Sequence, residues 1–338
     1  MTNTPPISSA GPTLPTTAVN DRSAIRERNH TNVARQWKQR CSPVGLHLFD
    51  RSTGLNILLD EVPVPASLHS RAPRQVSIAL TNRCDLACAH CYAPKSRSEL
   101  RYDVVTRWLY ELDSNGALGI GFGGGEPTLH RNFVELCHYA ARETRLSVSF
   151  TTHGHHIDEA LAEELRGSVH FIRVSMDGVG ATYTSIRRRS FHELQARLKL
   201  VRSISRFGIN IVVNERTLPD LDDAAAVAAD LGACELLLLP QAPVRDKPGI
   251  GDHILQGLRR WVETYVGPLR ICINEASADG FPTCDPLPKE RGLRAYAHID
   301  AAGVLKPTSY HATGVPIGEG RMLRALDHLA QELTENDP

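Results

Sequence analysis

Residues 75–92 read QVSIALTNRCDLACAHCY and place three cysteines directly after an apolar segment. Apolar residues alternate with small or polar ones in the first half, which is the pattern of a strand with one buried face. The thiols follow with the spacing CxxxCxxC, at Cys84, Cys88 and Cys91. Because iron–sulfur clusters are normally held by four cysteine thiolates, a compact group of three predicts a four-iron cluster with one coordination position open to another molecule.

Closely spaced cysteines also occur in structural zinc sites and in disulfide frameworks. A zinc ion could use His90 as its fourth ligand, but zinc sites usually consist of two separated ligand pairs, and the chain has no second CxxC pair. Disulfide frameworks are typical of short secreted domains, whereas this chain has 338 residues with 8 Cys and a start unlike a secretory signal. The zinc site stays open as an alternative.

The composition argues against several classes of protein. Lys+Arg and Asp+Glu are balanced at 38 each, so no overall charge attracts nucleic acid or an acidic membrane surface. The chain is 41% hydrophobic and contains no apolar run near the ~20 residues that cross a bilayer. We therefore expect a soluble protein with neither a nucleic-acid nor a membrane partner. A cytoplasmic location is expected because an open cluster and unpaired thiols fit a reducing compartment.

Four regions differ in their sequence pattern. Residues 1–40 are rich in Thr, Pro, Ser, Asn and Arg and are expected to form a disordered tail. Residues 41–72 are expected to hold a β-hairpin and a linker, because apolar and polar residues alternate on both sides of the turn at 51–54. The main domain is expected over 73–245. A C-terminal extension with a helix, a β-hairpin and a terminal helix is expected over 246–338.

From Gln75 onward, short strand patterns alternate with amphipathic helix patterns, which indicates a parallel sheet built from βα units. Six such units follow one another. Their apolar strand positions are Val76, Ile78 and Leu80; Leu118, Ile120 and Phe122; Leu146, Val148 and Phe150; Ile172, Val174 and Met176; Ile209, Ile211 and Val213; and residues 236–239.

One face of these strands is small or polar. The alternate positions are Ser77, Gly119, Gly121, Ser147, Ser149, Arg173, Ser175, Asn210 and Asn214. A closed eight-stranded barrel fills its interior with bulky branched side chains. This face therefore predicts a wider, incomplete TIM-like α/β barrel whose lumen holds a ligand. An ordinary doubly wound sheet is the alternative.

Two further motifs lie at the ends of expected strands. The second strand runs into GFGGGEPT at residues 121–128, where glycines permit close backbone approach and Glu126 could accept hydrogen bonds from an ammonium group. Alone, such a turn also fits a tight βα connection or a phosphate cradle. The fourth strand ends in Ser175 and Asp177, which share one face because strand side chains repeat every second residue. A simple turn is the alternative explanation for Asp177.

Together these motifs resemble the signature of the radical S-adenosylmethionine (radical SAM) superfamily, with CxxxCxxC followed by Tyr92 and a GGEP motif one βα unit later. The resemblance implies a partial (β/α)6 barrel with one [4Fe-4S] cluster at the C-terminal ends of its strands. In the family, the open iron binds the amino and carboxylate groups of S-adenosylmethionine. One electron from the cluster then cleaves this cofactor to methionine and a 5′-deoxyadenosyl radical.

The resemblance also implies which residues contact the two cofactors. Cys84, Cys88 and Cys91 match the cluster ligands. The positions that match contacts to S-adenosylmethionine are Gly124, Gly125 and Glu126 for the amino group, Ser175 and Asp177 for the ribose and methionyl portions, Asn214 near the nucleoside, and His90 beside the adenine.

Two groups of charged or titratable residues fall outside these motifs. His153, His155 and His156 follow the third strand and are expected to be solvated loop residues, with a metal site as the less favoured alternative. The basic run at 187–189 is also expected to be solvated, although it could meet a substrate carboxylate or an acidic peptide.

The C-terminal extension is weakly similar to the SPASM or twitch extension, which binds auxiliary clusters in many peptide-modifying family members. Residues 284–307 resemble its β-hairpin, but Thr308 and Ser309 stand where a cysteine would be expected. Cys272 and Cys284 alone do not complete a four-cysteine site, so no auxiliary cluster is predicted. Either thiol could instead relay a radical or donate hydrogen.

The resemblance therefore predicts an enzyme that abstracts hydrogen from an unactivated carbon, with an external electron donor such as flavodoxin or ferredoxin. Similarity to the SPASM hairpin favours a peptide or protein side chain as substrate. A small metabolite, such as a sugar, nucleoside or amino acid, is the alternative, because residues 44–65 are too short for a peptide-recognition domain. A non-catalytic metal-binding protein is a third hypothesis, against which the intact GGEP motif argues.

Overall fold

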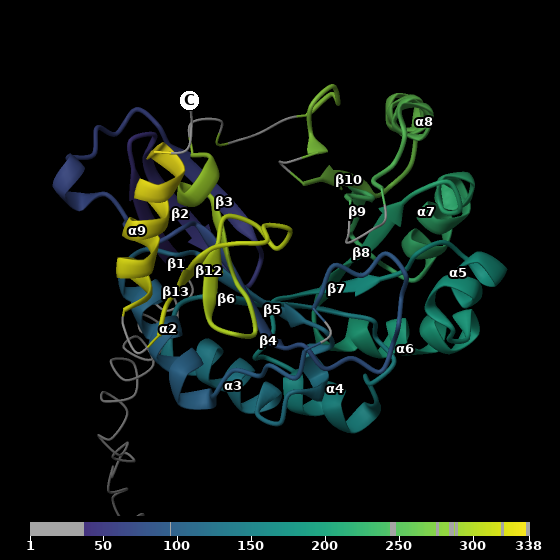
Figure 1. The fold of residues 1–338 in the computed structure, drawn as a ribbon, viewed down its shortest axis with the longest axis horizontal. Helices are drawn as coiled ribbons and strands as arrows, with labels where there is room; N and C mark the ends of the chain where they lie inside the picture. Colours follow the sequence, from purple (N-terminus) through teal and green to yellow (C-terminus); the bar gives the residue numbers. More distant parts are fainter. Residues whose placement is uncertain are drawn as a thin grey trace, which may run out of the picture.

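The computed structural model describes residues 37–94, 96–243, 248–274, 277–283, 287, 290–318 and 321–335. A central sheet runs through these residues, and an arc of helices lies along its outer side (Figure 1). A smaller sheet and the last helix, α9 (Met322–Glu335), lie together at one end of the arc. None of the described helices is both long and apolar enough to span a membrane.

Ten strands of the described residues form the central sheet, in the order β10-β9-β8-β7-β6-β5-β4-β11-β12-β13. All neighbours from β10 to β11 are parallel, and β12 and β13 add an antiparallel edge. The six strands expected from the sequence, β4 to β9, are present and lie side by side in chain order. The strands are β4 (Gln75–Thr81), β5 (Gly119–Gly124), β6 (Ser147–Thr152), β7 (Phe171–Ser175), β8 (Arg206–Val213), β9 (Glu235–Pro240), β10 (Arg270–Ile273), β11 (Tyr296–Ile299), β12 (Val304–Lys306) and β13 (Val315–Pro316).

Helices connect the successive parallel strands and cover the outer face of the sheet (Figure 1). The longer ones bury an apolar stripe at helical spacing, as α2 does with Val105, Trp108, Leu109 and Leu112, whereas α5 buries Tyr183 alone. These stripes and the outward strand positions form one hydrophobic core between helices and sheet. The helices are α2 (Tyr102–Ser114), α3 (Phe133–Glu143), α4 (Glu159–Leu165), α5 (Gly180–Arg187), α6 (Phe191–Ile204), α7 (Leu221–Asp230) and α8 (Asp252–Thr264).

The inner face of the sheet carries the small and polar residues expected from the sequence. Ser77, Gly121, Ser149, Arg173 and Asn210 all line one cavity of about 930 Å³. A doubly wound sheet would instead have helices on both faces. Within the described residues, no pairing joins the two edge strands β10 and β13. The expected open, partial barrel is confirmed, and the doubly wound alternative is wrong.

The N-terminal sheet is an antiparallel meander of β1 (Trp37–Ser42), β2 (Gly45–Asp50) and β3 (Leu55–Leu59). β2 and β3 form a hairpin where one is expected. β1 begins inside the stretch expected to be a tail, the rest of which lies outside the described residues. The buried positions of β1 are the polar residues Lys38, Arg40 and Ser42. The strand therefore lacks the apolar alternation by which a sequence pattern would reveal it.

A buried arginine attaches β1 to the end of the barrel where the strands begin. Arg40 donates through Nε to Glu290 at 2.5 Å. Its terminal nitrogens donate to the carbonyl oxygens of Ala72, Gly116 and Arg294 at 2.8, 2.9 and 3.0 Å. These carbonyls lie just before β4, β5 and β11, so one guanidinium connects the N-terminal sheet to three strands of the central sheet.

The C-terminal residues add to the central sheet next to its first parallel strand. β11 and β12 form a hairpin in the region where one is expected, and β11 pairs in parallel with β4. Asp300 holds the turn, because its carboxylate accepts from the backbone N–H groups of Ala302 and Val304 at 2.9 and 3.1 Å. This pairing brings Tyr296 and His298 onto the inner face of the barrel.

Candidate cofactor site

The cavity of about 930 Å³ spans the length of the strands, since its lining runs from Gln75 at the start of β4 to Glu126 beyond the end of β5. Asn214, one of the expected site residues, lines a neighbouring cavity of about 540 Å³, which shares His90 and Gln241 with the first. The other expected site residues all line the larger cavity: Cys84, Cys88, Cys91, His90, Gly124, Gly125, Glu126, Ser175 and Asp177.

The three cysteines occupy the loop directly after β4. The Cys91 N–H donates to the Cys88 carbonyl oxygen at 3.2 Å, and the Leu86 N–H donates to Cys84 Sγ at 3.4 Å. Burial raises the pKa of both the Cys84 and Cys88 thiols above the ordinary value. Metal coordination is the condition that would hold such buried thiols as thiolates.

The spacing of the ligand atoms bears on the zinc alternative. Three sulfurs bound tetrahedrally to one zinc at ~2.3 Å would lie about 3.8 Å apart. Among the described residues the one group of three ligand atoms within 4.8 Å of one another is on Cys84, Asp85 and His153. The ring of His90 contacts Asp177, with 3.0 Å between Nε2 and Oδ2. The three cysteines and His90 therefore do not form a zinc-binding group as they lie in this structure.

Gly124 and Gly125 bring the turn after β5 against the backbone that leads into the cysteine loop. The Gly125 N–H donates to the Thr81 carbonyl oxygen at 2.7 Å, and the Glu126 N–H donates to the Arg83 carbonyl oxygen at 2.8 Å. A Cβ atom on Gly124 would lie 2.2 Å from the first oxygen, and one on Gly125 would lie 2.2 Å from the second. Gly124 also has a φ of +118°, which favours glycine. The glycines thus let the cysteine loop and the glutamate turn pack together.

Glu126 is 1% exposed and lines the cavity. Its Oε1 accepts from Thr152 Oγ1 at 2.7 Å, from Thr128 Oγ1 at 2.8 Å and from the Thr128 N–H at 3.3 Å, while Oε2 accepts from the His153 N–H at 2.9 Å. Each carboxylate oxygen offers about two acceptor positions, so Oε2, with one hydrogen bond, keeps acceptor capacity for a further donor. A carboxylate fixed in this way suits an ammonium group.

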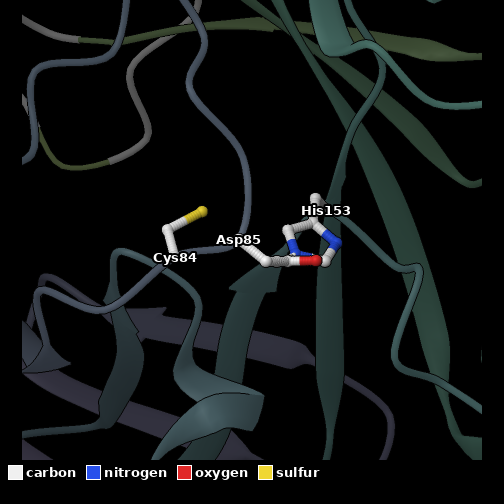
Figure 2. Close-up of side chains that lie close together, drawn as sticks. All are labelled: Cys84, Asp85 and His153. Atoms are coloured by element: carbon white, nitrogen blue, oxygen red, sulfur yellow. Dashed lines mark hydrogen bonds and ion pairs between the residues drawn. The ribbon is translucent and has the colours of Figure 1, made fainter.

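His153 connects Glu126 to the cysteine loop. Its Nε2 lies 2.9 Å from Asp85 Oδ1 and 3.3 Å from Glu126 Oε2. Figure 2 shows the ring against the Asp85 carboxylate, close to Cys84, and the ligand atoms of these three residues could together hold a metal ion. His153 and His155 are buried, so the expectation that they are solvated is wrong. The reason is that the segment after β6 runs along the rim of the cavity instead of into solvent.

Asp177, at the end of β7, is paired inside the protein. Its Oδ2 lies 2.6 Å from Arg187 Nη2 and 3.0 Å from His90 Nε2, and its Oδ1 accepts from the Val212 N–H at 2.9 Å. Burial alone would raise the pKa of Asp177, but Arg187 and His90 hold it at about 2. Arg187 also donates through Nη1 to Cys88 Sγ at 3.6 Å. Asp177 therefore supports the cysteine loop, and its expected contact with the cofactor stays a prediction.

The side chain of Arg187 is only 11% exposed, whereas that of Arg189 is 41% exposed. The expectation that residues 187–189 are solvated is therefore wrong for Arg187. Helix α5 ends at this residue, and Arg188 adopts a left-handed conformation with φ 55°. The reversal of the chain at Arg188 gives neighbouring arginines different surroundings.

Ser175 and Asn214 lie at successive strand ends but take different positions. Ser175 is half-buried and lines the larger cavity. Asn214 Oδ1 accepts from the Arg216 N–H at 2.9 Å, and its Nδ2 donates to Gln241 Oε1 at 3.0 Å. Asn214 is therefore connected to the larger cavity through Gln241, and its expected place near the nucleoside stays a prediction.

The C-terminal residues complete the wall of the cavity. Ser77 Oγ lies 2.6 Å from both Tyr296 Oη and His298 Nδ1. Tyr310 packs on Tyr92, the residue after the third cysteine, with 5.1 Å between ring centroids. Thr308 and Ser309, which stand where a SPASM extension would carry a cysteine, line the cavity as well.

Cys272 and Cys284 are the two thiols that the sequence offers as hydrogen donors. Cys272 is half-buried on the edge strand β10, opposite Leu237 of β9. Burial and then Glu235 raise its pKa, which keeps it a thiol, the form that carries a hydrogen atom. Cys284 lies outside the described residues. The donor role stays a prediction for both.

Asp85, His153 and Arg187 were not expected in the site from the sequence. Two signals were available. Asp85 sits between two cysteines of the CxxxCxxC motif, and His153 directly follows the third expected strand, where the βα loops of a parallel sheet carry functional residues. No sequence signal separates Arg187 from the two arginines that follow it.

Comparison with known proteins shows which family the chain resembles. Residues 78–228 match the model of the Radical SAM superfamily. The mycofactocin maturase MftC of Mycolicibacterium smegmatis is 30% identical over 172 residues, which are 48% of this chain and 43% of that protein. The Fe-coproporphyrin III synthase of Methanosarcina barkeri is 34% identical over 113 residues, which are 32% of this chain and 28% of that protein. The chain thus spans less than half the length of these relatives.

A solved structure supports the fold. SuiB of Streptococcus suis bound to S-adenosylmethionine has a TM-score of 0.70 at 14% identity, with 88% of this chain and 89% of that chain covered. The same protein bound to the precursor peptide SuiA has a TM-score of 0.67 at 13% identity, with 86% and 87% covered. The matched region includes the cysteine loop, the Glu126 turn and helix α5, and through this region, which is less than half of the chain, the protein is similar to the radical SAM superfamily.

Proposed function

We propose that this protein binds one [4Fe-4S] cluster and S-adenosylmethionine at the ends of its parallel strands and abstracts a hydrogen atom from a peptide or protein side chain. One observation carries the proposal. The three cysteines line the same cavity as Glu126, a buried carboxylate with acceptor capacity to spare.

The residues of the cavity suit both groups. Cys84, Cys88 and Cys91 would hold three irons and leave the fourth open. Glu126 would accept the N–H groups of the methionyl ammonium. Once bound, the cluster and S-adenosylmethionine supply reductive cleavage and the 5′-deoxyadenosyl radical that is typical of the family. We expect the electron to come from an external donor such as flavodoxin or ferredoxin.

The protein's own residues orient these groups. Thr128, Thr152 and His153 fix the Glu126 carboxylate before any ligand arrives, which lowers the cost of ordering on binding. Tyr92 and Tyr310 pack together at the wall of the cavity. A volume of about 930 Å³ is at the upper end of the usual ~300–1,000 Å³ for small-molecule sites, which leaves room for a cofactor and a substrate side chain.

Two comparisons support a peptide substrate. MftC is named a maturase, and SuiB was solved with a precursor peptide. The inner face also offers uncharged hydrogen-bonding groups on Ser77, Ser149 and Asn210, which suit the amide groups of a peptide.

A small molecule is the second candidate, and one observation favours it. The relative that is 34% identical over 113 residues is named for the synthesis of Fe-coproporphyrin III. The two candidates share the cofactor chemistry and differ in the carbon that is attacked.

Anaerobic reconstitution with iron and sulfide tests the cofactor proposal. We expect four irons and four sulfides per chain, and 5′-deoxyadenosine on addition of S-adenosylmethionine and a strong reductant. The Cys88→Ala variant should form at least 100-fold less 5′-deoxyadenosine at an unchanged melting temperature. A wild-type protein that binds zinc instead of iron, or that forms no 5′-deoxyadenosine, would overturn the proposal.

Deuterated candidate substrates test the substrate class. A precursor peptide encoded beside the gene, deuterated in its side chains, should transfer deuterium into 5′-deoxyadenosine. Transfer from a deuterated small metabolite, such as a porphyrin, with none from the peptide would establish the second candidate.

A further inference from the structure

We propose that Arg187 raises the reduction potential of the cluster, through its positive charge and its hydrogen bond to Cys88, and that Asp177 holds Arg187 in place. The inference rests on the proposed cluster at Cys84, Cys88 and Cys91. It concerns a residue of this chain that the resemblance to the family does not assign.

Arg187 is held in one orientation by its surroundings. Its Nη2 pairs with Asp177 Oδ2 at 2.6 Å, and its Nη1 donates to Cys88 Sγ at 3.6 Å. Asp177 is fixed in turn by the Val212 N–H at 2.9 Å and is 1% exposed. The guanidinium therefore bridges the end of β7 and a cluster ligand.

The hydrogen bond from Arg187 to Cys88 Sγ is strong only when Cys88 is a thiolate. Burying a guanidinium is costly unless its N–H groups have strong acceptors, and the neutral thiol is a weak acceptor. The Nε of Arg187 is buried without a hydrogen-bond partner among the described residues. The site thus places a partly unsatisfied cation next to a sulfur that becomes negative when the cluster is bound.

The charge favours the reduced cluster. Reduction adds one negative charge, so a cation beside a ligand sulfur stabilises the reduced form more than the oxidised form. Net charge and hydrogen bonds to sulfur are among the factors that set iron–sulfur potentials. The exposed Arg189 pairs with Asp85 at 2.7 Å, and solvent screens its charge far more strongly. Arg187 therefore makes the cluster easier to reduce, and Arg189 contributes little.

A redox titration followed by electron paramagnetic resonance tests this inference on the reconstituted full chain without S-adenosylmethionine. We expect Arg187→Gln to lower the equilibrium constant for reduction at least tenfold, which is 59 mV for a one-electron couple. Arg187→Lys keeps the charge but cannot reach Asp177 and Cys88 together, so its decrease should be measurable and smaller. The control Arg189→Gln removes the same charge from an exposed position and should change the constant less than threefold.

The outcomes separate this inference from the proposed function. If wild type binds no cluster, the proposed function fails and the inference fails with it. If all variants bind the cluster but Arg187→Gln shifts no more than Arg189→Gln, the inference alone is wrong. A shift seen only after S-adenosylmethionine is added would make Arg187 a cofactor ligand instead. If Arg187→Gln binds no cluster, Arg187→Met and Arg187→Lys are titrated together, and equal wild-type potentials in the two variants overturn the inference, whereas a potential that falls further in Met than in Lys supports it.

Discussion

Both ends of the central sheet bury charged side chains, but the two ends use them differently. Where the strands begin, Arg40 bonds to Glu290 and to three backbone carbonyls. Where the strands end, Arg187 shares its guanidinium between Asp177 and Cys88, and Glu126 keeps acceptor capacity toward the cavity. The hydrogen-bonding groups around Arg40 are paired within the protein, whereas those around Arg187 and Glu126 leave some groups available to a ligand.

The hydrogen-bond partners of these groups show the difference. Arg187 Nε is a buried nitrogen without a partner, whereas Arg40 and Glu290, both within the described part of the chain, have no such atom. A buried ion pair whose groups are all satisfied is expensive to break and specifies how elements dock. Incomplete satisfaction at the other end is typical of a binding site. Substitutions at the two ends should therefore affect stability and cofactor chemistry to different extents.

Arg40→Met should have the largest effect on stability. It leaves three carbonyl oxygens without this donor and Glu290 with Arg74 as its remaining arginine partner, so we expect the free energy of unfolding to fall by about 3–5 kcal/mol. Chemical denaturation measures this loss. Folded variant protein should still bind iron and form 5′-deoxyadenosine at the wild-type level. Loss of the cluster from folded Arg40→Met, or a destabilisation below about 1 kcal/mol, would contradict the view that the Arg40 network stabilises the fold and takes no part in cofactor binding.

Gly124→Ala should displace the cysteine loop, which lies where the strands of the central sheet end. Its Cβ would lie 2.2 Å from the Thr81 oxygen, at a φ of +118°, so the cysteine loop must move. We expect at least a tenfold loss in 5′-deoxyadenosine formation and a destabilisation of about 1–3 kcal/mol. The matched control is Gly123→Ala, whose Cβ would meet nothing within 4 Å. Equal loss of activity in the two variants would show that the glycines act through something other than loop packing.

Local patterns predicted most of the barrel from the sequence. Apolar alternation is a property of each strand by itself, so β4 to β9 could be recognised without knowing their partners. The cysteine loop and the glutamate turn were recognisable for the same reason, because each motif is contiguous in the chain. Their meeting in one cavity followed from the rule that parallel strands end at a common edge.

Residues whose role depends on distant partners could not be predicted. β1 has no alternation of apolar residues, because its buried position Arg40 is stabilised by Glu290, which lies 250 residues away in the sequence. Arg187 differs from Arg188 and Arg189 only in where the end of α5 places it. His153 looked like a loop residue because its partners, Asp85 and Glu126, come from two earlier strand ends. In each case a polar side chain is buried by tertiary contacts that no local pattern encodes.

The pH dependence of stability should follow from a histidine away from the cofactor cavity. Burial, assisted by Arg51, lowers the pKa of His170 to about 4, against about 6.5 in an unfolded chain. The neutral form therefore favours folding above pH 6.5, and this contribution is lost as the pH falls from 6.5 toward 4. Other buried histidines, His155 and His298, are lowered to about 4 as well and act in the same direction.

The measurement compares wild type with His170→Gln, which keeps an acceptor for the Val148 N–H but does not titrate. Between pH 7.5 and pH 5, wild type should lose about 1–2 kcal/mol more than the variant. Identical slopes would show that His170 titrates normally in the folded protein.

Ser190→Ala should have the smallest effect, although Ser190 lies just beyond Arg187 at the cofactor end. Its Oγ accepts from the Glu193 N–H at 3.3 Å and caps helix α6. Loss of an N-cap costs about 1 kcal/mol, and Asp158→Ala, which uncaps α4, should cost a similar amount. Neither variant should alter the cluster potential or 5′-deoxyadenosine formation. A shifted cluster potential in Ser190→Ala would mean that the start of α6 helps to position Arg187. Ser190 would then belong to the group of residues that supports the cysteine loop.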